Sequence, residues 1–155
     1  MFDGYFRVAA AVPPVQPADV AANTEAIVSM IENLDHDIDL VVFPELCVTG
    51  YTCGDLFHNL TLLDTVGDAL SRICEATAAS HSPVAVVGAP IRCGDAIYNC
   101  AVAVRGRVLA VVPKTYIPNY NEFYEKRWWA PAPGKMTEWT APDGSTVPFG
   151  THVLL

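Results

Sequence analysis

The chain has 155 residues, of which 52% are hydrophobic and 17% are charged, and its formal net charge is −8. This length suits one domain or less, and the apolar content is sufficient for a core, which argues against a disordered chain. The acidic balance argues against a nucleic-acid-binding protein, because phosphate binding needs clustered lysine and arginine.

The amino terminus lacks a basic segment followed by a hydrophobic one, and no apolar run reaches the length of a membrane span. We therefore expect a cytoplasmic protein with no membrane partner. The charge is uneven, because residues 1–104 carry three basic and thirteen acidic residues, net −10, whereas residues 105–155 carry six basic and four acidic residues, net +2. Chemistry on an anion is therefore expected in the later part.

The first ninety or so positions alternate between strand and helix patterns, as in a βαβ unit with parallel strands. The predicted elements, in chain order, are a strand at 6–12, a helix at 17–34, a strand at 39–43, a loop or short turn at 52–57, a helix at 59–79 and a strand at 84–88. This alternation predicts an α/β fold.

The later part of the chain is dominated by strand and turn patterns. Strands at 96–104 and 108–112 flank Arg105-Gly106-Arg107, which is typical of a hairpin. Further along, the sequence predicts a loop at 131–134, two strands within 137–149 around a turn at 142–145, and a strand that starts at 152–155. Because that last strand has no partner after it, we expect the chain to be part of a longer domain.

Two ionisable residues follow apolar strands directly after a proline: Glu45 after Pro44, and Lys114 after Pro113. Proline ends the ladder and a buried strand needs no charge, so both residues are expected at the carboxyl ends of strands, where α/β sheets bind ligands. The simpler interpretations are a helix cap for the glutamate and a solvated charge for the lysine. The repeated pattern favours a functional pair.

Residues 116–129 form the densest aromatic and charged segment of the chain, and neither helical nor strand periodicity explains it. Such a segment could pack as an interface or stack on nucleic acid, and the acidic composition disfavours the second. A loop that lines a pocket with aromatic rings and a few polar groups fits better.

Two motifs together resemble the nitrilase (carbon–nitrogen hydrolase) superfamily over essentially the whole chain. The first is Phe43-Pro44-Glu45-Leu46 with Gly50-Tyr51, and the second runs from Pro113-Lys114 through Tyr116, Pro118, Tyr120, Glu122, Phe123 and Glu125 to Arg127. The second motif, with Gly54-Asp55-Leu56, is similar more narrowly to the glutaminase domain of glutamine-dependent NAD⁺ synthetases. The resemblance implies an incomplete α-β-β-α sandwich, with residues 1–155 as its amino-terminal portion.

The resemblance also implies roles in a Glu–Lys–Cys triad that hydrolyses an amide. Glu45 corresponds to the general base and Lys114 to the stabiliser of the tetrahedral oxyanion, roles that suit a carboxylate and an ammonium. Glu125 corresponds to a glutamate that supports the lysine and the substrate, and Glu122 is a second candidate by spacing. The glutamine pocket would be lined by Tyr51, Tyr120 and Phe123.

The family nucleophile is a cysteine on a later strand, within a Glu-x-Cys-Glu-Asp type of sequence that this chain lacks. Cys47 is too close to Glu45 in sequence to leave room for a substrate, and Cys100 has no adjacent polar group except Asn99. We therefore expect this polypeptide alone to be inactive. The five cysteines (Cys47, Cys53, Cys74, Cys93 and Cys100) include no C-x-x-C pair for a metal site, and their odd number and the missing signal peptide argue against a disulfide framework.

In a complete protein of this kind, ammonia from glutamine would pass to a synthetase domain that uses ATP and Mg²⁺ to amidate deamido-NAD⁺. No phosphate-binding glycine loop is present in residues 1–155, so no cofactor is expected here. Homo-oligomers are expected once the domain is complete. Two alternatives are a stand-alone nitrilase-type amidase or carbamoylase, which would share Glu45 and Lys114, and an inactive fragment that only packs against partners.

Overall fold

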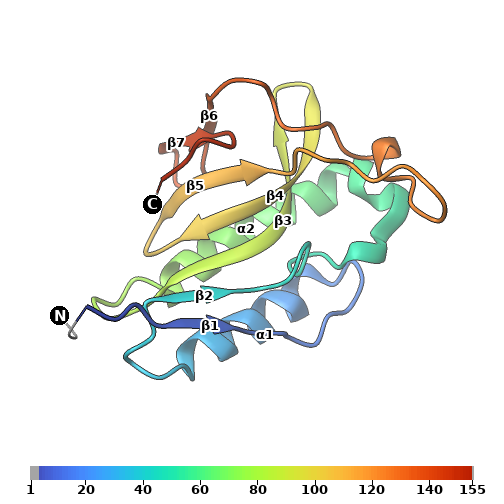
Figure 1. The fold of residues 1–155 in the computed structure, drawn as a ribbon. Coiled ribbons are helices and arrows are strands. Elements are labelled where there is room, and N and C mark those ends of the chain that lie inside the picture. The colour runs from blue at the N-terminus through green and yellow to red at the C-terminus, as the bar shows by residue number, and fades with distance from the viewer. Residues whose placement is uncertain (1–3, 155) are drawn as a thin grey trace.

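A computed structural model describes residues 4–154, which form one seven-stranded sheet with two long helices on one face (Figure 1). The elements are β1 (Val8–Ala10), α1 (Val20–Glu32), β2 (Leu40–Val42), the 3-10 helix η1 (Tyr51–His58), α2 (Leu60–Ala76), β3 (Val84–Cys93), β4 (Ala96–Val104), β5 (Val108–Pro113), the 3-10 helix η2 (Glu125–Arg127), β6 (Thr137–Thr140) and β7 (Thr146–Phe149). The fold is therefore mixed α/β, as predicted.

The strand order is β1-β2-β3-β4-β5-β7-β6. Strands β1, β2 and β3 are parallel, whereas β4 runs antiparallel to both β3 and β5. Two reversals bring β5 back to the direction of β2, so the carboxyl ends of these two strands meet at the same edge of the sheet. This topology brings Glu45 and Lys114, which follow those two ends, to one place.

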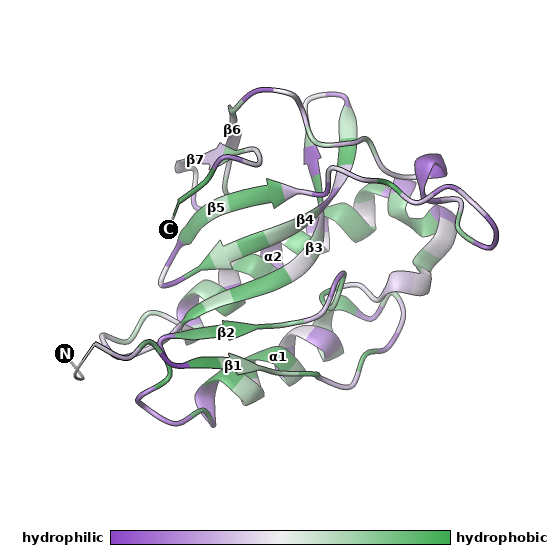
Figure 2. Cartoon of the chain, in the orientation of Figure 1, coloured by the Kyte–Doolittle hydropathy of each residue, from purple (hydrophilic) through white to green (hydrophobic). Residues whose placement is uncertain are grey.

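The helices form because each buries an apolar stripe against the sheet, and in Figure 2 hydrophobic (green) and hydrophilic (purple) residues follow one another along both helices. The fully buried side chains of this layer include Ile27 and Val28 of α1, Leu70 and Ile73 of α2, and Val41, Val87, Val102 and Val111 of the strands. Both helices are shorter than predicted, because side-chain caps fix their ends. Asp19 accepts a hydrogen bond from the Ala22 N–H (3.0 Å), and Thr77 donates its hydroxyl to the Ile73 carbonyl (2.8 Å).

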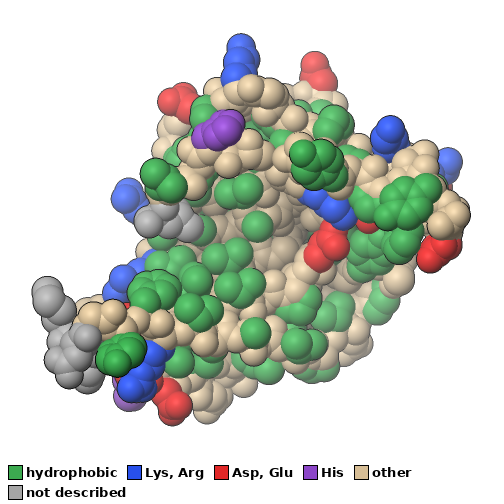
Figure 3. Space-filling model, in the orientation of Figure 1, with side chains coloured by type: hydrophobic (Ala, Val, Ile, Leu, Met, Phe, Trp, Pro, Cys, Tyr) green, Lys and Arg blue, Asp and Glu red, His purple; other side chains and the backbone are tan. Residues whose placement is uncertain are grey.

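The opposite face of the sheet is not covered by any helix of residues 4–154. Figure 3 shows hydrophobic side chains spread across this face, with acidic and basic groups meeting at its rim. A hollow of about 410 Å³ lies here, with apolar walls from β2, β3, β4 and β5. Its lining comprises Val42, Phe43, Pro44, Glu45, Val86, Val87, Gly88, Asn99, Cys100, Ala101, Val112, Pro113 and Lys114. The two predicted catalytic side chains therefore border an open apolar surface.

Other predicted elements also differ from the structure. Residues 152–154 are not in a strand, and residue 155 lies outside the described residues, so the predicted strand at 152–155 is wrong over its described part. Strand β3 continues past its predicted end at Gly88 to Cys93, because β4 pairs with it along its full length in spite of Pro90. The segment at 52–57, predicted as a loop or short turn, lies within the 3-10 helix η1. No helix within residues 4–154 is long and apolar enough to span a membrane.

Candidate active site

Glu45 lies in a tight turn after β2 that packs directly on β3. The Val48 N–H donates to the Gly88 carbonyl (3.1 Å), which ties the turn to that strand. A Cβ atom at position 88 would lie 2.6 Å from the Pro44 carbonyl oxygen and 2.8 Å from the Glu45 carbonyl carbon. These neighbours are backbone atoms that cannot move aside cheaply. Glycine at position 88 therefore allows the turn to sit against the sheet and sets the position of Glu45.

The next residue, Leu46, holds the turn in a strained shape. Its φ of 51° is in the left-handed region, which costs a residue other than glycine about 1–3 kcal/mol. Its side chain is fully buried, and its carbonyl accepts hydrogen bonds from the Gly50 N–H (2.7 Å) and the Thr49 N–H (3.2 Å). Burial and these hydrogen bonds maintain the turn against the backbone strain.

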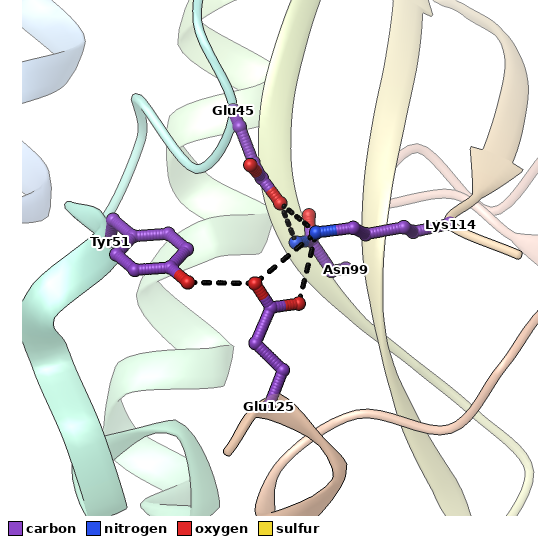
Figure 4. A network of polar contacts seen from close by, with 5 residues as sticks. All are labelled: Glu45, Tyr51, Asn99, Lys114 and Glu125. Carbon is purple, nitrogen blue, oxygen red and sulfur yellow. Dashed lines mark hydrogen bonds and ion pairs between the residues drawn. The ribbon is translucent and has the colours of Figure 1, made fainter. Parts of the chain in front are cut away.

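Lys114 follows β5 and reaches two carboxylates at once (Figure 4). Its backbone N–H donates to the Asn99 carbonyl of β4 (2.8 Å), which anchors the residue at the strand end. Its Nζ lies 2.8 Å from Glu45 Oε1, and 3.2 Å and 2.9 Å from Oε1 and Oε2 of Glu125. One ammonium thus bridges a half-exposed carboxylate and a buried one.

Glu125 is the buried member of this cluster, with 2% of its surface exposed. It begins η2, and its N–H donates to the Pro118 carbonyl (3.1 Å), which folds the preceding loop back over the sheet edge. Its Oε1 also accepts a hydrogen bond from the Tyr51 hydroxyl (2.7 Å). A buried carboxylate needs such partners, because an uncompensated charge in this position is costly.

The cluster affects the protonation of its members. Burial by itself lowers the pKa of Lys114, but the hydrogen bonds and charges of Glu45 and Glu125 outweigh it, and the net shift is upward. Burial, followed by the hydrogen bond to Glu125, raises the pKa of Tyr51. The ammonium and the phenol therefore both keep their protons at neutral pH, as hydrogen-bond donors to the two carboxylates.

The other predicted residues lie farther out on the loop before η2. Phe123 lines a pocket of about 270 Å³ with Tyr51, whereas Tyr120 does not line it and is 64% exposed. The rings of Tyr120 and Phe123 pack edge to face, with 5.9 Å between centroids. Glu122 is exposed and lines the same pocket, but the ion pairs of Lys114 within residues 4–154 are with Glu45 and Glu125. Of the two glutamates that the spacing left open, Glu125 is the one beside the lysine.

A second ion pair joins η1 to η2. Arg127 donates from Nε (2.6 Å) and Nη2 (2.7 Å) to the two oxygens of Asp55, and Trp128 Nε1 donates to the same carboxylate (3.1 Å). These donors hold the pKa of Asp55 below its usual range. The pair spans 72 positions, and sequence spacing alone did not predict it. It fixes the two short helices that carry Tyr51 and Glu125 relative to each other.

Asn99 is the site residue that sequence reasoning missed. It lies on β4 between the ends of β2 and β5, and its side-chain amide donates to Glu45 Oε1 (Figure 4). The residue is 3% exposed. The sequence signal that could have identified Asn99 is a polar carboxamide within the otherwise largely apolar strand β4.

None of the five cysteines has the environment of a nucleophile, because burial raises the pKa of every thiol. For Cys47 the pKa rises to about 11, and its Sγ contacts the Gly88 carbonyl (3.7 Å) below the Glu45 turn. Cys100 is 2% exposed. Reactive cysteines have a lowered pKa, near positive charge and with some exposure, whereas the pKa of each thiol here is raised; Cys47, Cys53 and Cys100 are also buried, and Cys74 and Cys93 are partly exposed.

Comparisons with known proteins show the family of the chain. The family model described as carbon-nitrogen hydrolase matches residues 7–152. The chain belongs to the carbon–nitrogen hydrolase family. It is 43% identical over 153 residues to the glutamine-dependent NAD(+) synthetase of Mycobacterium bovis, and 40% identical over 154 residues to that of Mycobacterium leprae. Each match covers 97% of this chain but 22% of the relative. The chain thus spans about a fifth of the length of these relatives.

Solved structures of the family share the fold. The glutamine-dependent NAD(+) synthetase of Cytophaga hutchinsonii matches with a TM-score of 0.81 and 29% identity, over 94% of this chain and 25% of that one. An amidase from Nesterenkonia, of the nitrilase superfamily, matches with a TM-score of 0.69 and 19% identity, over 92% of this chain and 54% of that one. The second match shows the fold alone. The seven-stranded sheet and its helices therefore form a nitrilase-type α/β fold.

Proposed function

We propose that residues 1–155 are the amino-terminal portion of a glutaminase domain. In the complete protein this domain would release ammonia from glutamine for the ATP-dependent synthesis of NAD⁺ from deamido-NAD⁺. The observation that carries the proposal is the contact of Lys114 with both Glu45 and Glu125 at the carboxyl edge of the sheet. The identity to glutamine-dependent NAD(+) synthetases supports glutamine as the amide.

In this proposal Glu45 takes the proton from the thiol of a cysteine outside residues 1–155, and the thiolate attacks the side-chain carbonyl carbon of glutamine. Lys114 stabilises the oxyanion that forms. Glu45 then gives the proton to the leaving nitrogen, ammonia departs, and a water molecule hydrolyses the thioester to release glutamate. Glu125 holds the Lys114 ammonium in place, the Tyr51 hydroxyl donates to Glu125, and Tyr51, Tyr120 and Phe123 border the substrate.

The partners belong to the same proposal. A synthetase domain outside residues 1–155 would receive the ammonia and bind ATP and Mg²⁺. The proposed steps at Glu45 involve neither ATP nor Mg²⁺. The open apolar face of the sheet would be covered in the complete domain, which we expect to form homo-oligomers.

The test is ammonia release by the complete protein from a panel of amides: glutamine, asparagine and simple aliphatic amides. We expect glutamine to be hydrolysed with the highest kcat/KM, and residues 1–155 alone to release no ammonia. Preference for a simple amide over glutamine would support a stand-alone amidase and contradict the proposal. Turnover by residues 1–155 alone that survives Cys47→Ala and Cys100→Ala would contradict the missing nucleophile.

A further inference from the structure

Asn99 is placed to organise the catalytic glutamate. Its carbonyl accepts the Lys114 backbone N–H (2.8 Å), and its side chain reaches Glu45 Oε1 from the same position on β4. A carboxylate only accepts hydrogen bonds, so the Asn99 group that faces it is the NH₂ group. One buried residue therefore connects the backbone of the lysine to the side chain of the glutamate.

The two oxygens of Glu45 have different surroundings. Oε1 accepts from Asn99 Nδ2 and from Lys114 Nζ (2.8 Å). Among residues 4–154, every hydrogen bond to the Glu45 carboxylate ends on Oε1. With two donors on Oε1, the unshared electron pairs available to take up a proton are those of Oε2.

A buried asparagine with a purely structural role bonds to backbone groups, and the chain offers a comparison. Asn23 is 1% exposed, and its Nδ2 donates to the carbonyls of Gln16 (2.8 Å) and Val48 (3.2 Å). The side-chain amide of Asn99 instead donates to the Glu45 carboxylate, which is half exposed and accessible to solvent. Its burial beside Glu45 therefore serves the orientation of that carboxylate.

We propose that Asn99 is a positioning residue that holds Oε1 of Glu45 and leaves Oε2 as the oxygen that takes the proton from the nucleophile. The proposal rests on the proposed function in one respect, the role of Glu45 as general base. Without the Asn99 amide the Glu45 carboxylate can rotate, and Oε2 is then no longer held in one orientation toward the nucleophile. Misplacement of a catalytic group by about 1 Å costs up to about a hundredfold in rate.

The kinetic test compares Asn99→Leu and Asn99→Asp in the complete protein, with glutamine as substrate. We expect Asn99→Leu to lower kcat about tenfold or more while KM stays within about twofold, the signature of an interaction needed in the transition state. Asn99→Asp should lose more, because a new carboxylate competes with Glu45 for Lys114. Equal kcat in wild type and Asn99→Leu would overturn the proposal.

The matched control is Thr77→Val, at the far end of α2. Thr77 is also fully buried and makes side-chain hydrogen bonds, including one from the Gly106 N–H (3.0 Å). Thr77→Val should lower the melting temperature and leave kcat unchanged. If Thr77→Val lowered kcat as much as Asn99→Leu for the same loss of melting temperature, the loss of kcat would follow from lost stability, and the proposal would be wrong.

A second measurement needs no turnover and uses the ¹⁵N-labelled complete protein. The Asn99 side-chain NH₂ signal is assigned by its loss in Asn99→Asp. We expect its bonded proton to move upfield in Glu45→Ala and to stay in place in the control Glu122→Ala. An unchanged signal in Glu45→Ala would overturn the proposal. If the wild-type complete protein released no ammonia from glutamine, the proposed function would fail, and this measurement would still decide whether Asn99 holds Glu45.

Discussion

Lys114 Nζ lies 2.8 Å from Glu45 Oε1, although 69 positions separate the two residues in sequence. The sheet topology explains the contact: β2 and β5 run in the same direction, and β3 and β4 lie between them. Each residue follows a proline at the carboxyl end of its strand. The fold therefore brings the Glu45 carboxylate and the Lys114 ammonium together at the rim of the open face.

The Glu45 turn depends on the missing side chain of Gly88. In Gly88→Ala the new Cβ would overlap the backbone of the turn, which we expect to cost about 1–3 kcal/mol of unfolding free energy and most of the glutaminase activity. Gly134→Ala is the control, because its Cβ would meet nothing within 4 Å. Urea unfolding and ammonia release measure the two effects. Wild-type behaviour of Gly88→Ala would show that the turn does not need this close contact.

Removal of the lysine should leave a buried charge without its partner. In Lys114→Met the buried Glu125 carboxylate loses its positively charged partner. Because an unpaired buried charge is costly, we expect the unfolding free energy to fall by about 3 kcal/mol. Adding Glu125→Gln should recover most of this stability and none of the activity. A double variant no more stable than Lys114→Met, measured by urea unfolding, would show that the ion pair is not the source of the loss.

The two glutamates of the loop should separate by mutation. Glu125→Gln keeps the shape but halves the negative charge around Lys114, and we expect kcat to fall about a hundredfold, within the range for loss of one preorganised electrostatic partner. Glu122→Gln, at an exposed position on the pocket rim with no ion pair to Lys114 among the described residues, should keep kcat within about twofold. The reverse order of effects on ammonia release would assign the supporting role to Glu122.

Tyr51 should make stability sensitive to alkaline pH. Burial and the hydrogen bond to Glu125 raise its pKa in the folded state, so folding favours the neutral phenol. This contribution is fully present below about pH 10, the ordinary value for tyrosine, and is lost as the pH rises from there through the raised pKa. The unfolding free energy of wild type should therefore exceed that of Tyr51→Phe at neutral pH, and the difference between the two should disappear at alkaline pH. Tyr120→Phe serves as the control, and a difference that persisted at alkaline pH would contradict the hydrogen bond.

The α/β fold was predictable because its signals are local. Periodic apolar stripes identify both helices, and Arg105-Gly106-Arg107 identifies the hairpin of β4 and β5. The pairing of β7 with β5 in parallel, and its place between β5 and β6, depend on contacts between distant segments and were not predicted. The strand predicted at 152–155 shows the limit of local reasoning, because an apolar run becomes a strand only where a neighbour pairs with it.

The positions of the candidate site residues were predictable in part for the same reason. Glu45 and Lys114 stand out because a single charge follows an apolar strand and a proline. Spacing could not separate Glu122 from Glu125, because the choice depends on which side chain the loop turns inward. Asn99 was missed because a carboxamide within a strand has no sequence signature of its own, and its role depends on the turn that Gly88 admits against the sheet.

The most direct measurement of the central claim is NAD⁺ formation by the complete protein carrying Glu45→Gln, with either glutamine or ammonium as the nitrogen source. We predict that glutamine-dependent synthesis is lost while ammonium-dependent synthesis continues at the wild-type rate, because in the proposed function the Glu45 site only releases ammonia. Glutamine-dependent synthesis that persists in Glu45→Gln would contradict the assignment of Glu45 as the base of the glutaminase.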